Sequence, residues 1–380
     1  MFKNIVYVKK MQLPSNSASI LQTLNMIWAF SENECHVKAC INAKNKNIII
    51  EIVDKYSLNR LLKPEFFCIK TKNKGVYSLI FFIYIVKNWI FNKKSIFIAR
   101  DLKEGFCVSI LKKYLKRDHF FIYEMHDSVY LEKINSLKID DLSIKKKENF
   151  ILNSADLIIY TGPYLKKIVG DLYNPVSIGD VVPPGYNPNI FAPIVSEVRR
   201  KDSVKLAYFG TLFSGKGVDV FLDALSVLPA SYCGVIVGGN PASRLDELKR
   251  RVRELALSDR VSFSGQVSPS MVPLTLSGVD AIVIPFQTDT EFLSPIKLYE
   301  GLALGLPIIA TPTPALVELS KTIKSLVVAD DCNSESLAAC VQSLFSDNDR
   351  LNTVRVCAMK RNDVCTWKVR ANKILGFCKI

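Results

Sequence analysis

The sequence predicts an α/β protein with two doubly wound, Rossmann-like domains. Short apolar runs alternate with helix-length segments along most of the chain, and a stretch rich in Pro, Gly and Asn, residues 181–193, separates two such series. Continuous apolar strands between helices are typical of parallel sheets that are covered on both faces. The 380 residues suffice for two domains of ordinary size.

The first series predicts one complete α/β domain. Its apolar runs predict buried strands at residues 4–8, 95–100, 120–126 and 155–162, and the segments between them predict helices at 17–30, 76–91 and 104–117.

The helix expected at 76–91 contains the apolar stretch 75–86, which carries no charge. A membrane-spanning helix needs about 20 such residues, so this stretch is too short to span. We therefore expect a buried helix. The alternative is a helix on a membrane surface, which aromatic residues and lysines just beyond the stretch favour: Trp89, Phe91, Lys93 and Lys94.

The second series predicts strands at 204–210, 233–239, 261–265, 280–286 and 306–312. We place the first domain at 1–188 and the second at 189–355. Residues 356–380 are expected to form a C-terminal helix that returns to the first domain. A cleft between the two domains is the expected ligand site.

The charge is positive and unevenly distributed. The net charge is +14, and residues 1–188 contribute 28 Lys and Arg against 17 Asp and Glu, or +11. Such a field suits nucleic acid or an anionic membrane surface. The sequence contains no recognisable nucleic-acid-binding motif, so we expect no nucleic-acid partner. The charge then suits an anionic membrane surface, or it merely keeps the protein soluble.

Cysteine and histidine spacing predicts neither a metal site nor a disulfide framework. The ten cysteines contain no Cys-x-x-Cys pair, and the three histidines are His36, His119 and His126. No zinc-ligand spacing results. Reduced cysteines in a cytoplasmic protein are the simplest interpretation.

A helix start at residues 294–297 predicts an anion site. Ser294 before Pro295 is typical of a helix N-terminus, with Ser as the N-cap and Pro as the first helical residue. The free amides up to Ile296 and the positive helix end would bind an anion, and Lys297 lies in the first turn. Glu300 is placed to accept hydrogen bonds from a ribose diol. An ordinary capped helix with a surface glutamate would have the same pattern.

A second candidate site follows the strand expected at 204–210. The strand ends at Gly210, and Gly215, Lys216 and Gly217 precede the next helix. Backbone amides in such a loop approach phosphate oxygens, and the lysine neutralises charge. The loop is neither a P-loop nor a GxGxxG motif.

Together these segments resemble the glycosyltransferase family 4 enzymes. The resemblance rests on "YFGTL…GKGVDVFLDAL" and "SPIKLYEGLALGLPIIAT", with "FSGQVSPSMVPLTLSGVDAIVIPF" between them and "PPGYNPNIF" before them. In the first half, "PSNSASILQTLNMIWAF" and "YEMHDSVY" resemble the acceptor domain of bacterial members more loosely. The resemblance implies the GT-B fold, in which two doubly wound domains face each other across a cleft.

The resemblance implies roles for individual residues. Lys216 matches the family lysine on the donor diphosphate, and Glu300 matches the second Glu of the Glu-x7-Glu motif, which holds the ribose. Backbone around Gly265 and Val267 is expected to meet the nucleotide base. His126 matches a histidine that faces the donor sugar. The catalytic residues would therefore be His126, Lys216 and Glu291, and those around the donor are Gly210, Thr211, Lys216, Gly265, Val267, Ser294, Pro295, Ile296, Lys297 and Glu300.

Two positions depart from the family pattern. The first Glu of the motif falls on Phe292, and Glu291 lies one residue early. The family arginine falls on Thr211, so one cation is missing, and Lys297 is expected to supply part of its charge. Either Glu291 still reaches the sugar, or backbone groups near Leu293 and Ser294 replace it.

The implied function is retaining, metal-independent transfer of a sugar from a UDP- or GDP-sugar, with no further cofactor. The acceptor would be a lipid-linked glycan in O-antigen, capsule or related polysaccharide synthesis, and the protein would be cytoplasmic and attached peripherally to the anionic inner face of the cytoplasmic membrane. Two alternatives stay open: a sugar-nucleotide epimerase on the same fold, and a catalytically weak sugar-nucleotide-binding subunit, which the displaced Glu291 and the missing arginine motivate.

Overall fold

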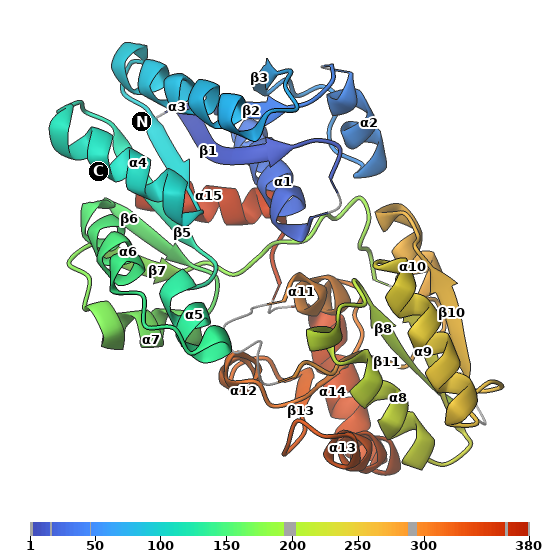
Figure 1. Cartoon of the computed structure of the whole chain (residues 1–380). Helices are drawn as coiled ribbons and strands as arrows, with labels where there is room; N and C mark the ends of the chain where they lie inside the picture. The colour runs from blue at the N-terminus through green and yellow to red at the C-terminus, as the bar shows by residue number, and fades with distance from the viewer. Residues whose placement is uncertain are drawn as a thin grey trace. The chain divides into compact units, whose positions relative to one another are not determined.

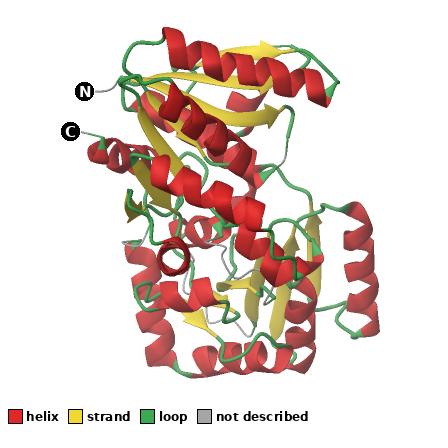
Figure 2. Ribbon diagram, turned by 60° about the vertical axis from the view of Figure 1, so that its left-hand side comes forward, coloured by secondary structure: helices red, strands yellow, loops and turns green. Residues whose placement is uncertain are grey.

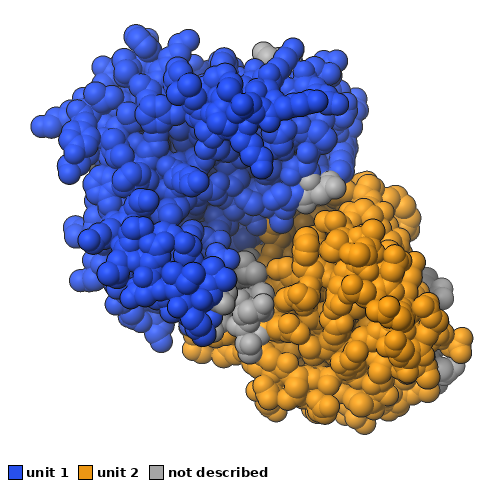
Figure 3. All heavy atoms as spheres, in the orientation of Figure 1, with its two compact units in different colours: residues 1–185, 365–380 blue, residues 186–364 orange. Residues whose placement is uncertain are grey.

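The computed structural model of the chain describes residues 3–15, 17–45, 47–193, 203–287, 295–361 and 364–378. The chain forms two compact units (Figure 3). Unit 1 comprises Met1–Gly185 and Cys365–Ile380, and unit 2 comprises Tyr186–Val364. Each unit is a parallel sheet with helices packed against it, as Figures 1 and 2 show.

Unit 1 contains a seven-stranded sheet in the order β3-β2-β1-β4-β5-β6-β7, and every pairing is parallel. The order reverses between β1 and β4, which is the topological switch point of a doubly wound fold. Successive residues of β1, from Ile5 to Val8, are fully buried, because helices cover both faces of this strand. The strands are β1 (Asn4–Gln12), β2 (His36–Asn42), β3 (Glu65–Ile69), β4 (Ile96–Ala99), β5 (Phe120–Met125), β6 (Leu157–Tyr160) and β7 (Ile178–Val181).

The last helix of the chain belongs to unit 1. This helix, α15, packs along α1, and Trp367, Ala371 and Ile374 join the same core as Met26 and Phe30 (Figure 1). The helices of the unit are α1 (Ala18–Glu32), α2 (Ile48–Lys55), α3 (Lys74–Phe91), α4 (Leu102–Tyr114), α5 (Val129–Leu137), α6 (Leu142–Ser154), α7 (Pro163–Tyr173) and α15 (Trp367–Phe377).

Unit 2 contains a six-stranded parallel sheet in the order β10-β9-β8-β11-β12-β13, with its switch point between β8 and β11. Two apolar clusters pack on it, one around Phe221 and Leu248 and the other around Phe286 and Leu302. The strands are β8 (Val204–Phe209), β9 (Tyr232–Val237), β10 (Val261–Gly265), β11 (Ala281–Ile284), β12 (Ile308–Ala310) and β13 (Leu326–Val328). The α-helices are α8 (Val218–Val227), α9 (Ala242–Glu254), α10 (Val272–Thr275), α11 (Ile296–Ala303), α12 (Pro314–Ser320), α13 (Ser334–Ser346) and α14 (Asn348–Lys360).

The unit boundaries differ from those expected from the sequence. The division falls after Gly185 rather than after residue 188, and the returning segment begins at Cys365 rather than at 356. The reason for the second difference is α14, whose Leu351 and Val354 are buried in the core of unit 2.

Edge strands account for three of the four strands that the sequence analysis did not identify, and the fourth is β2. β3 and β7 are the edges of the first sheet, and β13 is an edge of the second. An edge strand is less completely covered, so its sequence lacks a long apolar run: β7, for example, has no buried residue.

The expectation that 76–91 is buried is wrong for one of its two faces. The inner face of α3 is buried, with Phe81, Ile85 and Trp89 each at most 2% exposed. On the outer face, Leu79 is 60% exposed and Ile83 is 53% exposed. The helix has apolar residues on both faces, and the sheet of unit 1 covers only one of them.

Candidate functional site

Polar and charged side chains collect at the switch point of each sheet. In parallel α/β sheets, ligands bind beyond the carboxyl ends of the strands where the strand order reverses. In unit 2 these ends are the carboxyl ends of β8 and β11, and in unit 1 the corresponding ends are those of β1, β4 and the adjacent β5.

Lys297 is the central residue of the unit 2 site. It lies in the first turn of α11, and its Nζ is 4.0 Å from the centre of the Tyr208 ring on β8. This ammonium is buried, and no hydrogen-bond acceptor reaches it from the residues that the structure describes. A cation–π contact compensates only part of the hydration that a buried ammonium loses. No group among the described residues fully balances this charge, so the site is suited to bind an anion.

A second lysine shares this site. The Nζ atoms of Lys216 and Lys297 lie 4.9 and 5.4 Å from the centre of the Phe286 ring, just beyond β11. Gly217 brings the Lys216 loop to this position: it has φ +70°, and a Cβ atom there would lie 1.5 Å from the carbonyl oxygen of Pro285. Only glycine permits this approach of loop to strand end. Two cations thus converge at the switch point.

The pKa values of the two ionisable groups of α11 in this site, Lys297 and Glu300, are both shifted towards neutral pH. Burial lowers the pKa of Lys297 to about 7, and repulsion from Lys216 contributes to this shift. Burial also raises the pKa of Glu300, one turn further along α11, to about 7, although Lys297 acts in the opposite direction. An anionic ligand would favour the charged ammonium, because it supplies the missing countercharge.

Gly210 forms the edge of the site next to Lys297. It ends β8 with φ +133°, and a Cβ atom there would lie 2.9 Å from Lys297 Nζ. The next residue, Thr211, accepts a hydrogen bond through its carbonyl oxygen from the Tyr208 hydroxyl. Thr211 stands where the family pattern has an arginine. The ammonium of Lys297 lies beside the preceding residue, Gly210.

The other expected donor-site residues lie in the same unit, except where the structure does not describe them. Gly265 ends β10 with φ +66°, and Val267 follows two residues later in the same loop. Pro295 is the N-cap of α11 and Ile296 its first residue, one position later than expected. Glu291 and Ser294 lie outside the described residues.

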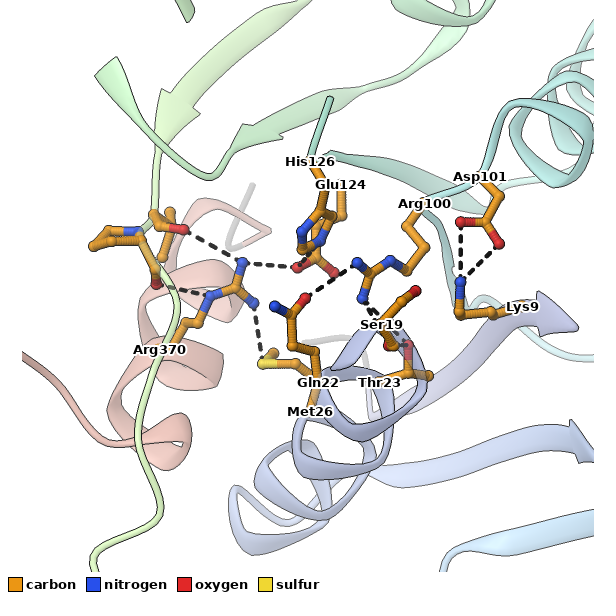
Figure 4. A network of polar contacts seen from close by, with 12 residues as sticks. Lys9, Ser19, Gln22, Thr23, Met26, Arg100, Asp101, Glu124, His126 and Arg370 are labelled. Carbon is orange, nitrogen blue, oxygen red and sulfur yellow. Dashed lines mark hydrogen bonds and ion pairs between the residues drawn. The ribbon is translucent and has the colours of Figure 1, made fainter. Parts of the chain in front are cut away.

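The unit 1 site is built around Glu124, the next-to-last residue of β5, which is 3% exposed (Figure 4). Its Oε1 accepts from Arg370 Nη2 at 2.8 Å and lies 3.0 Å from His126 Nε2. Its Oε2 accepts from the Tyr7 hydroxyl at 2.7 Å. Burial alone would raise the pKa of Glu124, but Arg370 and His126 hold it well below the ordinary value. Glu124 is therefore a carboxylate.

This carboxylate determines which form of His126 is present. An ionised carboxylate only accepts hydrogen bonds, so His126 must donate through Nε2–H. Burial lowers the pKa of His126 to about 4, with Arg100 as the second cause, so the ring is neutral near pH 7. The neutral Nε2–H ring has its lone pair on Nδ1.

Arg100 is the other cation at this switch point. It follows β4, donates to the Ser19 carbonyl oxygen at 3.1 Å and to Gln22 Oε1 at 3.1 Å, and so connects the strand end to α1 (Figure 4). Lys9 of β1 forms an ion pair with Asp101 at 2.7 Å. Glu124, Arg100 and Lys9 therefore each have a polar or charged partner within unit 1.

Sequence reasoning identified the cations of unit 2 but not their aromatic support. Tyr208 and Phe286 read as ordinary strand residues, and nothing in their spacing indicated that lysines would lie on their rings. It also missed Arg370, which is 187 residues from its carbonyl partner Pro183. The one available signal was an arginine within the apolar pattern of the last helix. Among the described residues, no group of three His, Cys, Asp or Glu side chains is arranged to hold a metal ion.

Comparison with known protein families finds a match for the second unit. Residues 203–347 match the sequence model of the family described as "Glycosyl transferases group 1". The matched segment covers most of unit 2, which is therefore similar to glycosyl transferases group 1 domains. All the described donor-site residues, from Gly210 to Glu300, lie within the matched segment.

Curated relatives resemble part of the chain. Mannosylfructose-phosphate synthase of Agrobacterium fabrum is 26% identical over 269 residues, covering 65% of this chain and 58% of the relative. The GDP-mannose-dependent alpha-(1-6)-phosphatidylinositol monomannoside mannosyltransferase of Mycobacterium tuberculosis is 25% identical over 245 residues, covering 60% and 62%. The chain thus matches about three fifths of the length of these relatives.

The similarity to solved structures extends over the whole chain. HepE of Anabaena, in complex with UDP, superposes with a TM-score of 0.75 and 14% identity, covering 99% of each chain. The chain has the GT-B fold, as expected from the sequence, with two doubly wound parallel sheets.

Proposed function

We propose that this protein is a retaining glycosyltransferase that uses a nucleotide-diphosphate sugar. The observation that carries the proposal is the buried ammonium of Lys297, which has no acceptor among the described residues and lies next to Lys216 in the segment that matches the glycosyl transferases group 1 family. A diphosphate fits this site, because its two adjacent phosphates supply negative charge to both lysines at once.

The two lysines would stabilise the leaving group. Cleavage of the bond between sugar and diphosphate leaves negative charge on the β-phosphate, and Lys216, Lys297 and the N-terminus of α11 are cationic groups fixed in place before the reaction. Glu300 would accept hydrogen bonds from the ribose hydroxyls, and backbone near Gly265 and Val267 would meet the base.

Transfer with retention needs no nucleophile from the protein in this proposal. The acceptor hydroxyl attacks the sugar on the face that the diphosphate leaves, and the departing phosphate takes the acceptor proton. Positioning then supplies much of the rate enhancement. Neutral His126 would face the donor sugar and offer Nδ1 as a hydrogen-bond acceptor. Glu291 would contact the sugar if its loop presents it.

The mannosyl-transferring relatives make GDP-mannose the first donor to test. A thermal-shift screen should compare GDP-mannose, UDP-glucose and other UDP- and GDP-sugars. A true donor at 100 times its dissociation constant should stabilise the protein by about 2.7 kcal/mol. Lys297→Met should abolish the shift, whereas Lys249→Met, an exposed lysine of α9, should retain it. No shift with any nucleotide sugar or nucleoside diphosphate would contradict the proposal.

Product analysis separates this proposal from its two alternatives. A transferase yields a glycosylated acceptor, an epimerase yields an isomeric nucleotide sugar, and a weakly active binding subunit yields neither without a partner. We further propose that the reaction is metal-independent, because two lysines occupy the leaving-group position. Activity should therefore survive EDTA, and complete loss that only Mn²⁺ or Mg²⁺ restores would contradict this point.

We also propose that the acceptor is a lipid-linked glycan of O-antigen, capsule or related polysaccharide synthesis and that unit 1 attaches to the inner face of the cytoplasmic membrane. The support is the outer face of α3, which is formed by Val76, Leu79, Phe82, Ile83, Ile90 and Phe91, all at least 39% exposed. The opposite face is fixed in unit 1, where Trp89 Nε1 donates to the Leu115 carbonyl oxygen. The helix would therefore lie in the membrane interface rather than span it.

Charge favours an anionic lipid surface as the occupant of this face. The segment 70–94 has no Asp or Glu and contains Lys70, Lys72, Lys74, Lys87, Lys93 and Lys94. Lysines near both helix ends would meet lipid phosphates while the apolar residues between them enter the interface. Two copies of the same face would repel each other through these lysines, which disfavours self-association.

Vesicle flotation tests this attachment. The protein should float with vesicles of phosphatidylcholine and phosphatidylglycerol at low salt and be released near 0.5 M salt, because the Debye length falls well below 8 Å. Ile83→Asp and Lys87→Glu should each weaken binding, and Val227→Asp, at an exposed site of unit 2, should not. Absence of flotation, or a dimer that Ile83→Asp dissociates, would contradict the membrane proposal.

A further inference from the structure

We propose that Arg370 of the C-terminal helix is a positioning residue for His126: it partners Glu124 so that the histidine remains neutral, with its hydrogen on Nε2 and a free lone pair on Nδ1. The catalytic part of this inference rests on the proposed function. The effect of Arg370 on the protonation of His126 through Glu124 involves unit 1 alone, and it can be measured without an activity assay.

Arg370 is almost completely buried, and its hydrogen-bond partners belong to unit 1. It is 1% exposed, and its guanidinium is held by the Pro183 carbonyl oxygen at 2.9 Å, the Val182 carbonyl oxygen at 3.3 Å and Glu124 at 2.8 Å. The two carbonyl groups would bind a neutral donor equally well. The full positive charge serves chiefly Glu124, the only carboxylate within ion-pair distance among the described residues, because the Trp367 ring lies 5.9 Å away and gives a weaker contact.

Glu124 lies between two groups that can balance its charge. Arg370 Nη2 and His126 Nε2 both contact the same atom, Oε1, as Figure 4 shows. With the arginine present, the carboxylate already has a cation, and the histidine contributes only a neutral hydrogen bond. Without the arginine, a buried carboxylate would lack a countercharge, which is costly. The nearest group able to acquire a proton and a positive charge is His126.

Three other titratable or charged groups lie near the His126 ring or next to it in the sequence: Arg100, Tyr7 and Asp127. Arg100, at the end of β4, disfavours a second positive charge and is the next cause after burial of the lowered pKa of His126. Tyr7, from β1, donates to the other oxygen of Glu124. Asp127 follows His126, and burial raises its pKa to about 6. Removal of Arg370 therefore changes the balance mainly through Glu124.

The experiment is side-chain NMR of histidine in ¹⁵N-histidine-labelled full-length protein across pH 5–8. The chain has only three histidines, and His126→Gln identifies the signal of interest. In the wild type, His126 should remain neutral and protonated on Nε2 down to pH 5. In Arg370→Met its pKa should rise by at least one unit, so that at least about half of the ring is imidazolium at pH 5. Arg370→Lys, which keeps the charge, should restore the neutral ring.

A matched control lies on the same helix. Lys373 is exposed, and its Nζ donates to the Val181 carbonyl oxygen at 3.4 Å. Lys373→Met removes one positive charge from α15 without touching Glu124, so the His126 signal should not move. If Arg370→Met does not fold, Arg370→Gln makes the same charge change and keeps donors for the two carbonyl groups.

Kinetics link the charge relationship to catalysis. One pH unit below the pKa that NMR gives for His126 in Arg370→Met, this variant should have a kcat about tenfold lower than at pH 8, with little change in KM for the nucleotide sugar, and its pH profile should have an acid limb at that pKa. A folded Arg370→Met or Arg370→Gln whose His126 signal is identical to that of the wild type would overturn the inference. If the NMR change occurs but no donor is turned over, the failure lies with the proposed function.

Discussion

The two switch points of this protein treat buried charge in opposite ways. In unit 1, the buried carboxylate of Glu124 is surrounded by Arg370, His126 and Tyr7, and every one of these contacts is made within the unit. In unit 2, the ammonium of Lys297 lies against an aromatic ring and has no acceptor among the described residues. The first site is electrostatically complete, whereas the second is not.

The difference indicates which site requires a charged ligand. A completed network fixes the geometry and protonation of its members, and it gains little from an added charge. An unpartnered cation weakens the free protein and strengthens the complex with an anion, because the missing interaction is made only on binding. Unit 2 is therefore suited to bind a diphosphate, and unit 1 is suited to hold a neutral histidine in place.

The largest expected effect is a difference in stability between two variants, Arg370→Met and Lys297→Met, each of which replaces one buried cation by methionine. Arg370→Met should lower the free energy of unfolding by about 3–5 kcal/mol, because it breaks a buried ion pair. Lys297→Met should leave the ligand-free protein as stable or more stable, because it removes a buried ammonium that has no acceptor among the described residues. Urea denaturation of the ligand-free proteins measures both. A comparable loss in the two variants would remove the distinction between the sites.

The ribose contact of Glu300 should give the next largest effect. Glu300→Gln should weaken nucleoside diphosphate binding by about 1.5–3 kcal/mol, the range for a hydrogen bond to a charged group. The wild type should also discriminate against a 2′,3′-dideoxynucleoside diphosphate, and the variant should not. Calorimetry with both ligands tests this. If the variant still discriminates between them, another group binds the ribose.

The pH dependence of nucleotide binding should be bell-shaped with its maximum near pH 7. Below about 7 Glu300 becomes protonated and loses acceptor strength, and above about 7 Lys297 loses its positive charge. Lys297→Met should abolish the alkaline limb, and Glu300→Gln should abolish the acid limb. Titration of the nucleotide phosphate is the same for all variants and cancels in the comparison. A wild-type profile that is flat between pH 6 and 8.5 would contradict these assignments.

A smaller effect should appear in the acid stability of unit 1. Because the pKa of His126 is lowered in the folded state, the unfolded chain binds this proton more readily. Stability should therefore fall as the pH decreases from 6.5 towards 4, by about 1–3 kcal/mol. His126→Gln should make this part of the curve flatter. An unchanged slope in the variant would show that other groups cause the acid sensitivity.

The sequence predicted the doubly wound fold because central strands such as β1 and β11 are apolar on both faces. It gave Lys216, Lys297 and Glu300 as candidate donor-site residues because of their spacing relative to glycines and a helix start. It did not predict Arg370 as part of the His126 site, because that contact depends on the return of α15 to unit 1. It also misjudged α3, since helical periodicity does not reveal whether a second apolar face is covered.

The most direct test of the central claim is a calorimetric comparison of nucleoside diphosphates with their nucleosides. GDP and UDP should be titrated into the full-length protein alongside guanosine and uridine, with Lys297→Met as the matched variant. For the better base, the diphosphate should bind the wild type at least 100-fold more tightly than the nucleoside, and most of this advantage should disappear in the variant. Equal affinity of diphosphate and nucleoside for the wild type would contradict a diphosphate site at Lys297.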